Sequence, residues 1–367
     1  MNNYRLKEQL ESLAKSLGLA KIRFLPAEDL PEWENEVKVR SQADATAKAY
    51  WEKRNYSGNY KNIMKDAKSF VIAAFPYMPA KDSRDLNAPY LDPHYLAYPK
   101  GRAAVFELAN MLKEQGFKAL VDPPLPIKLI AYKSGIGLFG KNGLVYNREE
   151  GSFMSLHLLL TDATFPYTSH YNETISDCGT CRLCIDTCPN NAIGENGRVC
   201  MSKCLRHYML TSEIIPINIR ERMGMRFIGC GDCRIVCPKN AIKFKRTNIK
   251  QADYFKLDIG EILENHSNLK EYLKGLAKVI GKNLARPIPI ISMAIIAAGN
   301  SKDKAFVKGL TETLFHWHPT IRAHSAWALA RLADNSALDS LNNALSRESE
   351  HLVTSEIEAA IKKLARL

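Results

Sequence analysis

The segment that decides the fold is residues 178–189, which read CGTCRLCIDTCP. Two residues separate each of its first three cysteines from the next, so their thiolates can surround one face of an iron–sulfur cubane. The fourth cysteine, Cys188, follows after three further residues, precedes Pro189 and is expected to point the opposite way. Zinc sites combine pairs of ligands and do not use such a run. We therefore predict [4Fe–4S] clusters and one-electron transfer.

A second motif, residues 230–238, reads CGDCRIVCP and lacks one of the four cysteines. Both motifs are typical of bacterial two-cluster ferredoxins, in which the cysteine before proline ligates the other cluster and each cluster takes four thiolates. The first cluster is then expected to take Cys178, Cys181, Cys184 and Cys237. The second is expected to take Cys188, Cys230, Cys233 and one intervening cysteine, either Cys200 or Cys204.

The remaining composition indicates a cytosolic protein with a polyanionic partner. All nine cysteines lie between Cys178 and Cys237, which favours metal ligation over a disulfide framework. The N-terminus has no apolar signal-peptide core, and the longest apolar run, residues 287–299, is too short to span a bilayer. The formal net charge of +12 suits nucleic acid, although a solvated basic surface has the same composition. Basic residues at 239–250 are candidate phosphate contacts.

Three segments follow from the pattern along the chain, and the fold class is α+β. Residues 1–170 predict an α/β domain, with a buried strand at 69–75, a helix at 106–116 and a short strand at 118–121. Residues 171–247 form the two-cluster module. Residues 248–367 read as helices only, and proline-initiated apolar helices at Pro287 and Pro319 suggest HEAT-like repeats.

A glycine-rich loop, residues 134–143, reads SGIGLFGKNG. Closely spaced glycines let the backbone approach a large ligand or form a tight turn. A dinucleotide-binding loop is disfavoured, because Pro123, Pro124 and Pro126 interrupt the preceding strand and no acidic residue stands in a following strand. His157 lies in an apolar run and reads as a core histidine with satisfied hydrogen bonds.

With this loop, Gly151-Ser152, Thr161-Asp162, the ferredoxin module and the helical end, nearly the whole chain resembles the epoxyqueuosine reductase family. These are cobalamin-dependent iron–sulfur enzymes of tRNA modification, related in their core to reductive dehalogenases. The resemblance implies a nitroreductase-like domain that binds a corrinoid and clusters that reduce cobalt. It further implies two-electron removal of the epoxide oxygen from epoxyqueuosine in a tRNA anticodon loop, which yields queuosine.

The resemblance also implies roles for individual residues. It favours Cys204 over Cys200 as the last cluster ligand. It also matches Asp122 to the family's catalytic acid, although the spacing from Asp122 to the glycine-rich loop is about one residue shorter than in the family and the intervening chain is rich in proline. Lys128 and Tyr132 are alternative proton donors. The segment 95–102 lacks the family's Asp-Tyr-His, which puts the substrate side of the pocket in question. The expected corrinoid contacts are Gly135, Gly137, Gly140, Lys141, Asn142 and Ser152.

We therefore expect a cytoplasmic, monomeric oxidoreductase with two [4Fe–4S] clusters and cobalamin. Its partners would be tRNA and an electron donor such as ferredoxin or flavodoxin, without a membrane. Two alternatives stay open. One is a corrinoid iron–sulfur reductase of a small molecule. The other is an electron-transfer or activator protein that docks a protein partner through its helices.

Overall fold

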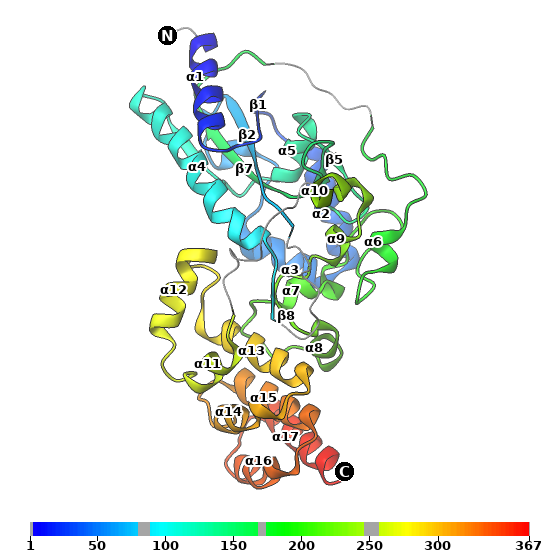
Figure 1. The fold of residues 1–367 in the computed structure, drawn as a ribbon. Helices are drawn as coiled ribbons and strands as arrows, with labels where there is room; N and C mark the ends of the chain where they lie inside the picture. The colour runs from blue at the N-terminus through cyan, green and yellow to red at the C-terminus, as the bar shows by residue number, and fades with distance from the viewer. Residues whose placement is uncertain (1–2, 80–88, 168–173, 246–256, 367) are drawn as a thin grey trace. The chain divides into compact units, whose positions relative to one another are not determined.

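The computed structural model describes residues 3–79, 89–167, 174–245 and 257–366, and the chain divides into two compact units (Figure 1). The first unit comprises Met1–Pro79, Leu96–Cys204 and Gly231–Ile249. The second comprises Ala80–Tyr95, Leu205–Cys230 and Lys250–Leu367. The domain boundaries predicted near residues 170 and 247 lie outside the described residues. The two units instead divide the cysteine-rich segment, because Leu205–Cys230 belongs with the helices.

An antiparallel four-stranded sheet with the strand order β1-β2-β7-β4 forms the centre of the first unit. The strands are β1 (Lys21–Pro26), β2 (Ser69–Pro76), β7 (Met154–Thr161) and β4 (Ala119–Val121). The strands predicted at 69–75 and 118–121 are confirmed. Strand β2 is apolar nearly throughout because both faces of this central strand are covered.

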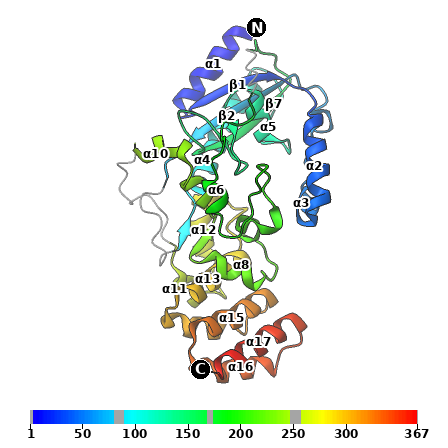
Figure 2. The ribbon, with the colours of Figure 1, turned by 90° about the vertical axis from the view of Figure 1, so that its right-hand side faces the viewer.

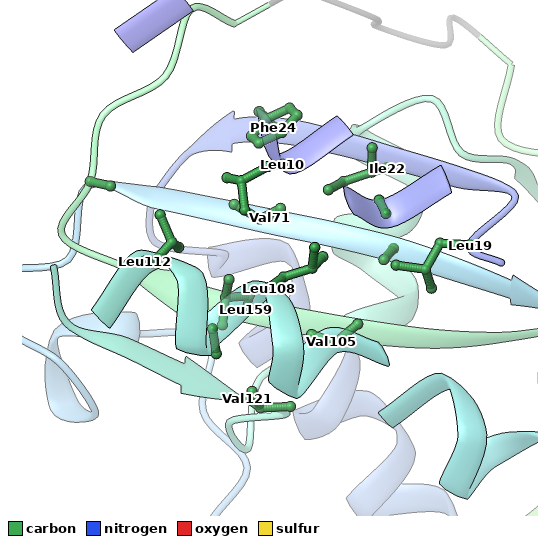
Figure 3. Close-up of a cluster of buried hydrophobic side chains, with 14 of the residues drawn as sticks. Leu10, Leu19, Ile22, Phe24, Val71, Val105, Leu108, Leu112, Val121 and Leu159 are labelled. Atoms are coloured by element: carbon green, nitrogen blue, oxygen red, sulfur yellow. The ribbon is translucent and has the colours of Figure 1, made fainter. Parts of the chain in front are cut away.

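Alternate residues of the strands face two different cores. Helices α1 (Asn3–Ser16) and α4 (His94–Glu114) cover one face, where Leu10 and Leu108 pack on Val71 and Leu159 (Figure 3). On the other face, Ile72, Leu158 and Leu160 pack against α5 (Ile127–Lys133). The period of two along β2 and β7 thus fixes which residues meet α4.

Short elements complete the first unit. Helices α2 (Pro31–Ala43) and α3 (Ala45–Arg54) pack together, and β5 (Leu138–Phe139) pairs with β6 (Val145–Tyr146). The cysteine-rich segments carry single-turn helices, as expected of chain that wraps a cofactor. They are α6 (Leu183–Asp186), η2 (Met201–Lys203), α9 (Asp232–Ile235), η3 (Pro238–Asn240) and α10 (Ala241–Lys245).

In the second unit, the described residues from 257 onward contain helices but no strand, as predicted. Every second helix packs on the next: α15 (Pro319–Leu332) contacts both α13 (Pro287–Ser301) and α17 (His351–Leu364) (Figure 2). Proline begins α13 and α15 at a position whose N–H would have no intrahelical partner. The other elements are β3 (Tyr90–Leu91), α7 (Leu205–Tyr208), α8 (Ile217–Met223), β8 (Arg226–Ile228), α11 (Ile259–Glu264), α12 (Lys270–Ile280), α14 (Val307–Thr313) and α16 (Leu338–Leu345). Among the described residues, no helix is both long and apolar enough to cross a membrane.

A buried histidine, His324, links the helices of the second unit. Its Nε2 accepts a hydrogen bond from the Ile215 N–H at 3.0 Å, and its Nδ1 lies 2.6 Å from the Ser292 hydroxyl. Burial, and to a smaller extent Arg220, lowers the pKa of His324 well below its usual range. Because Nε2 is the acceptor for Ile215, protonation would break this hydrogen bond.

We therefore expect His324 to make the second unit sensitive to acid. Below its ordinary pKa of about 6.5, the unfolded chain binds a proton that the folded unit does not, so stability is lost as the pH falls. His324→Gln should be less stable at neutral pH but should lose less stability between about pH 7 and pH 5. Hydrogen exchange of the α13 and α15 amides measures this. An equal loss in both proteins would contradict the prediction.

Candidate functional site

The cysteine loops of the first unit bring together the thiols expected to bind the first cluster. None of the nine cysteines, all of which lie within the described residues, forms a disulfide, and all are partly exposed. The pKa of Cys184 is raised first by its burial and then by Cys237, Cys178 and Cys181, so these four thiols are electrostatic neighbours. Cys237 feels Cys178 and Cys181 in the same way. The crossed ligand set stays a prediction, because no group of three or more His, Cys, Asp or Glu side chains among the described residues is arranged to hold a metal ion.

The two candidates for the last ligand differ in their surroundings. The Cys200 thiol lies 3.4 Å from the Asp44 carboxylate and 3.2 Å from the Ser202 hydroxyl. Asp44 also accepts the N–H groups of Ser202 and Thr46 at 3.0 Å, so it ties this segment to the start of α3. Cys200 thus has a role in holding the loop, and the choice of Cys204 as the ligand stays a prediction.

Two residues of the glycine-rich loop hold the cluster-binding segments. The Lys141 ammonium donates to the carbonyls of Gly179 and Cys181, at 2.7 and 3.0 Å. The Asn142 amide donates to the carbonyl of Cys233 at 3.0 Å, and its side chain is buried. Backbone carbonyls in such irregular segments need donors from elsewhere, and these two side chains supply them.

A second contact joins the start of β7 to the segment after Cys237. The Asn240 side chain accepts the Ser152 N–H at 2.6 Å and donates to the Arg234 carbonyl at 2.6 Å. A Cβ at Gly151 would lie 2.0 Å from the Asn240 oxygen, so only glycine permits this approach. Sequence reasoning did not single out Asn240. Its only signal was its place three residues after a ligand cysteine.

Close backbone contacts and a tight turn within the chain account for glycine at several positions of the loop. A Cβ at Gly137 would lie 2.3 Å from the Tyr146 carbonyl oxygen, because β5 and β6 pack closely there. Gly143 donates to the Gly140 carbonyl at 2.8 Å, which closes a tight turn, and Gly135 has a φ of 75°. Closely spaced glycines indicated either close approach to a large ligand or a tight turn, and the loop contains the tight turn. The arrangement requires no ligand, so corrinoid contacts at these residues and at Lys141, Asn142 and Ser152 stay a prediction.

Two basic residues after the second motif have partners within the first unit. Lys239 pairs with Asp177 at 2.7 Å, and the buried Lys243 pairs with Glu150. The hydrogen bond from Lys239, ahead of one from Tyr146, lowers the pKa of Asp177. Neither lysine is therefore a free phosphate contact. Lys245 is exposed, and positions 246–250 lie outside the described residues.

Asp122 lies at the end of β4, where the sheet sets its position. Val121 pairs with Leu159, and the Asp122 N–H continues the ladder by donating to the Leu158 carbonyl at 2.7 Å. Asp122 has a φ of 49°, a left-handed conformation that aspartate tolerates better than most residues. Its side chain is mostly buried, with 12% exposed.

Several donors converge on the Asp122 carboxylate. Oδ1 accepts the Leu158 N–H at 3.0 Å, and Oδ2 accepts the Tyr98 hydroxyl at 3.2 Å. The Arg102 Nε lies 3.6 Å from Oδ2. Burial, reinforced by Asp122, raises the pKa of Tyr98 above its usual range, so the phenol keeps its proton. A fixed carboxyl group beside a half-exposed tyrosine and arginine can exchange a proton with a bound molecule.

The fourth partner of Asp122 is His157, whose Nδ1 lies 3.1 Å from Oδ2. Tyr98 and Arg102 come from the segment in which the sequence lacked the expected motif.

The alternative proton donors lie in other contacts, since Lys128 donates to the Gly143 carbonyl at 2.8 Å and Tyr132 packs on Phe139.

Comparisons with known proteins show what the cysteine-rich segment and the whole chain are similar to. Residues 177–240 match the family model described as a 4Fe-4S double cluster binding domain. The chain is 27% identical over 386 residues to the epoxyqueuosine reductase of Bacillus subtilis (strain 168), covering 99% of this chain and 97% of that protein. The chain is thus similar over nearly its full length to proteins named epoxyqueuosine reductase.

Solved structures of epoxyqueuosine reductases share the mixed α/β fold. A selenomethionine-labelled enzyme aligns with a TM-score of 0.82 and 24% identity over 99% of this chain and 100% of that chain. An epoxyqueuosine reductase bound to an epoxyqueuosine-modified tRNA-Tyr stem loop aligns with a TM-score of 0.80 and 24% identity, with the same coverage. At this identity the structures establish the fold.

We expect the two intervening cysteines to respond differently to substitution. Cys204→Ser should lose the second cluster, because serine is a poor substitute for a thiolate ligand. Cys200→Ser should keep both clusters, since its hydroxyl can still donate to Asp44. Iron analysis and electron paramagnetic resonance of the reduced proteins, purified without oxygen, measure this. Loss of iron from Cys200→Ser alone would reverse the assignment.

Proposed function

We propose that this protein is an oxidoreductase that converts epoxyqueuosine to queuosine in tRNA. The observation that carries the proposal is homology over the full chain to proteins named epoxyqueuosine reductase, together with the double-cluster module. Removing an epoxide oxygen as water takes two electrons and two protons. The chain offers a place for each: thiols for clusters that carry electrons, and a fixed carboxyl group that can transfer a proton.

The clusters accept electrons one at a time from a reduced carrier of the ferredoxin or flavodoxin class. The first cluster takes Cys178, Cys181, Cys184 and Cys237, and the second takes Cys188, Cys204, Cys230 and Cys233. Lys141 and Asn142 orient two of the ligand segments through backbone carbonyls. Hydrogen bonding of this kind keeps the thiolate positions fixed while the charge of the cluster changes.

A corrinoid is part of the proposal because of the family resemblance. When bound, it would supply low-valent cobalt as a two-electron reductant. The proposed corrinoid contacts are Gly135, Gly137, Gly140, Lys141, Asn142 and Ser152. These residues already have structural roles, in tight turns or in hydrogen bonds to other parts of the chain. We therefore assign no step to them.

Asp122 is the proposed catalytic acid. Breaking a carbon–oxygen bond leaves an oxygen that must be protonated, and a positioned carboxyl group does this efficiently. The Leu158 N–H and the Tyr98 hydroxyl fix the two carboxyl oxygens, and Tyr98 and Arg102 lie on the exposed side. Their exposure supports access of substrate from that side.

The tRNA-bound homologue supports tRNA as the partner. A nitroreductase-like first domain, HEAT-like helices, a monomeric state and a cytoplasmic location belong to the same proposal. The paired helices of the second unit, α13 to α17, agree with a repeat architecture.

We expect the chain, loaded with clusters and cobalamin, to convert epoxyqueuosine in tRNA to queuosine under a strong reductant. Asp122→Asn should keep its clusters and its affinity for tRNA but react at least about 10²-fold more slowly, because it cannot supply the proton. Mass spectrometry of the digested nucleosides measures this.

The matched control is Asp162→Asn. Asp162 also accepts a backbone N–H next to β4, from Lys118 at 2.8 Å, but lies at the opposite end of that strand. This variant should retain wild-type turnover. Unchanged tRNA despite bound corrinoid would favour a small-molecule substrate. A sample that binds no corrinoid would leave only the electron-transfer alternative.

A further inference from the structure

His157 is a buried histidine placed between Asp122 and a buried hydroxyl. Its side chain is 0% exposed, as is that of Ser155 on the same strand. Nδ1 lies 3.1 Å from Asp122 Oδ2, and Nε2 lies 3.0 Å from the Ser155 hydroxyl. Residues two apart on a strand point to the same face, so β7 itself sets this second contact.

The hydroxyl of Ser155 makes both protonation states of the ring possible. A hydroxyl can donate or accept, so it satisfies Nε2 with or without a proton. When both ring nitrogens are protonated, Nδ1–H donates to the Asp122 carboxylate and Nε2–H donates to Ser155. When the Nδ1 proton has passed to Asp122, the carboxyl group donates to Nδ1 and Nε2–H still donates to Ser155. After Asp122 has given up its proton, the neutral ring can carry its proton on Nδ1, and Ser155 then donates to Nε2. A proton can therefore lie on either side of the 3.1 Å contact without leaving a buried polar atom unpaired.

The neighbouring elements leave room for the ring and bring few charges to it. A Cβ at Gly101 on α4 would lie 2.6 Å from the His157 Nε2, so this helix position admits only glycine without movement. On β2, the residue paired with His157 is the small Ala73. The titratable and charged groups facing the Asp122–His157 pair are Tyr98 and Arg102 on α4, with Tyr56 acting on Tyr98.

We propose that His157 is a positioning residue that holds Asp122 and shares one transferable proton with it. The inference rests on the proposed function of Asp122 and adds the source of its proton. The protonated ring passes the Nδ1 proton to Asp122 Oδ2, which breaks an N–H bond and forms an O–H bond. Asp122 gives that proton to the oxygen leaving the substrate, whose electrons come from the clusters. Solvent then restores the proton on the exposed side, where Tyr98 lies.

The first test separates orientation from proton supply. His157→Asn keeps an N–H donor near the position of Nδ1 but cannot ionise. We expect it to bind clusters and tRNA normally, with a KM for tRNA within about 2-fold, and to lower the single-turnover rate about 10²-fold. Its rate should also follow a different pH profile from that of the wild type, because the ring proton that the wild type can transfer is gone. A wild-type rate and pH profile in His157→Asn would overturn the proposal.

The second test asks whether the two residues act as one unit. Because both removals interrupt the same transfer, Asp122→Asn combined with His157→Asn should be no slower than Asp122→Asn alone. Multiplied losses would mean independent roles and would overturn the proposal. Ser155→Ala, which removes this partner of Nε2 but leaves the contact between Nδ1 and Asp122, should fall between the wild type and His157→Asn.

A third test needs no turnover. In the chain with oxidised clusters and ¹⁵N-labelled histidine, the signals missing from His157→Asn identify the ring nitrogens. We expect these nitrogens to shift in Asp122→Asn and to stay unchanged in Asp162→Asn. No shift in Asp122→Asn would overturn the pairing. If the wild type fails to reduce tRNA while this shift is present, the proposed reaction is wrong and the pair itself stands.

Discussion

The hydrogen bonds from the chain between β5 and β7 to the cluster-binding segments are the constraint on which the first unit depends. Lys141 and Asn142 satisfy carbonyls beside Cys181 and Cys233, and Ser152 engages Asn240. Each such bond contributes only about 1 kcal/mol net, but an unpaired carbonyl or amide in these segments would cost more. The contacts therefore select one arrangement of the cysteine loops.

The same stretch of chain connects the cysteine loops of the unit to the Asp122 carboxylate. Ser152 contacts the segment that follows Cys237, and a few residues later Ser155, His157 and Leu158 contact each other or Asp122. Because β7 is paired on both sides, by β2 and by β4, it is a rigid support for both. Sites built on strands hold their geometry better than sites on loops. The cysteine loops and Asp122 are thus both held by β7 or by the chain that leads into it.

The sequence was sufficient where spacing alone carries the chemistry. The cysteine runs predicted the cluster module, and apolar periodicity predicted β2 and the helices from Pro287 onward. The glycine loop was ambiguous, because its glycines are required by the Tyr146 carbonyl and by a turn, and neither contact can be read from local sequence. Helix α1 ends at Ser16, since Gly18 with a φ of 79° leads into β1.

His157 shows why the rest of the site required the fold. In sequence it is one polar residue among leucines, which is the pattern of a core histidine with satisfied hydrogen bonds. The fold places its ring between Ser155 and Asp122 and clears the space with Ala73 and Gly101. Burying a polar chain of three side chains next to an apolar core costs stability unless every atom is paired. A leucine in its place would suit the apolar core but would leave the buried Ser155 hydroxyl without this partner and would remove one partner from Asp122. The histidine is thus explained by its contacts with Ser155 and with an acid that reaches the surface.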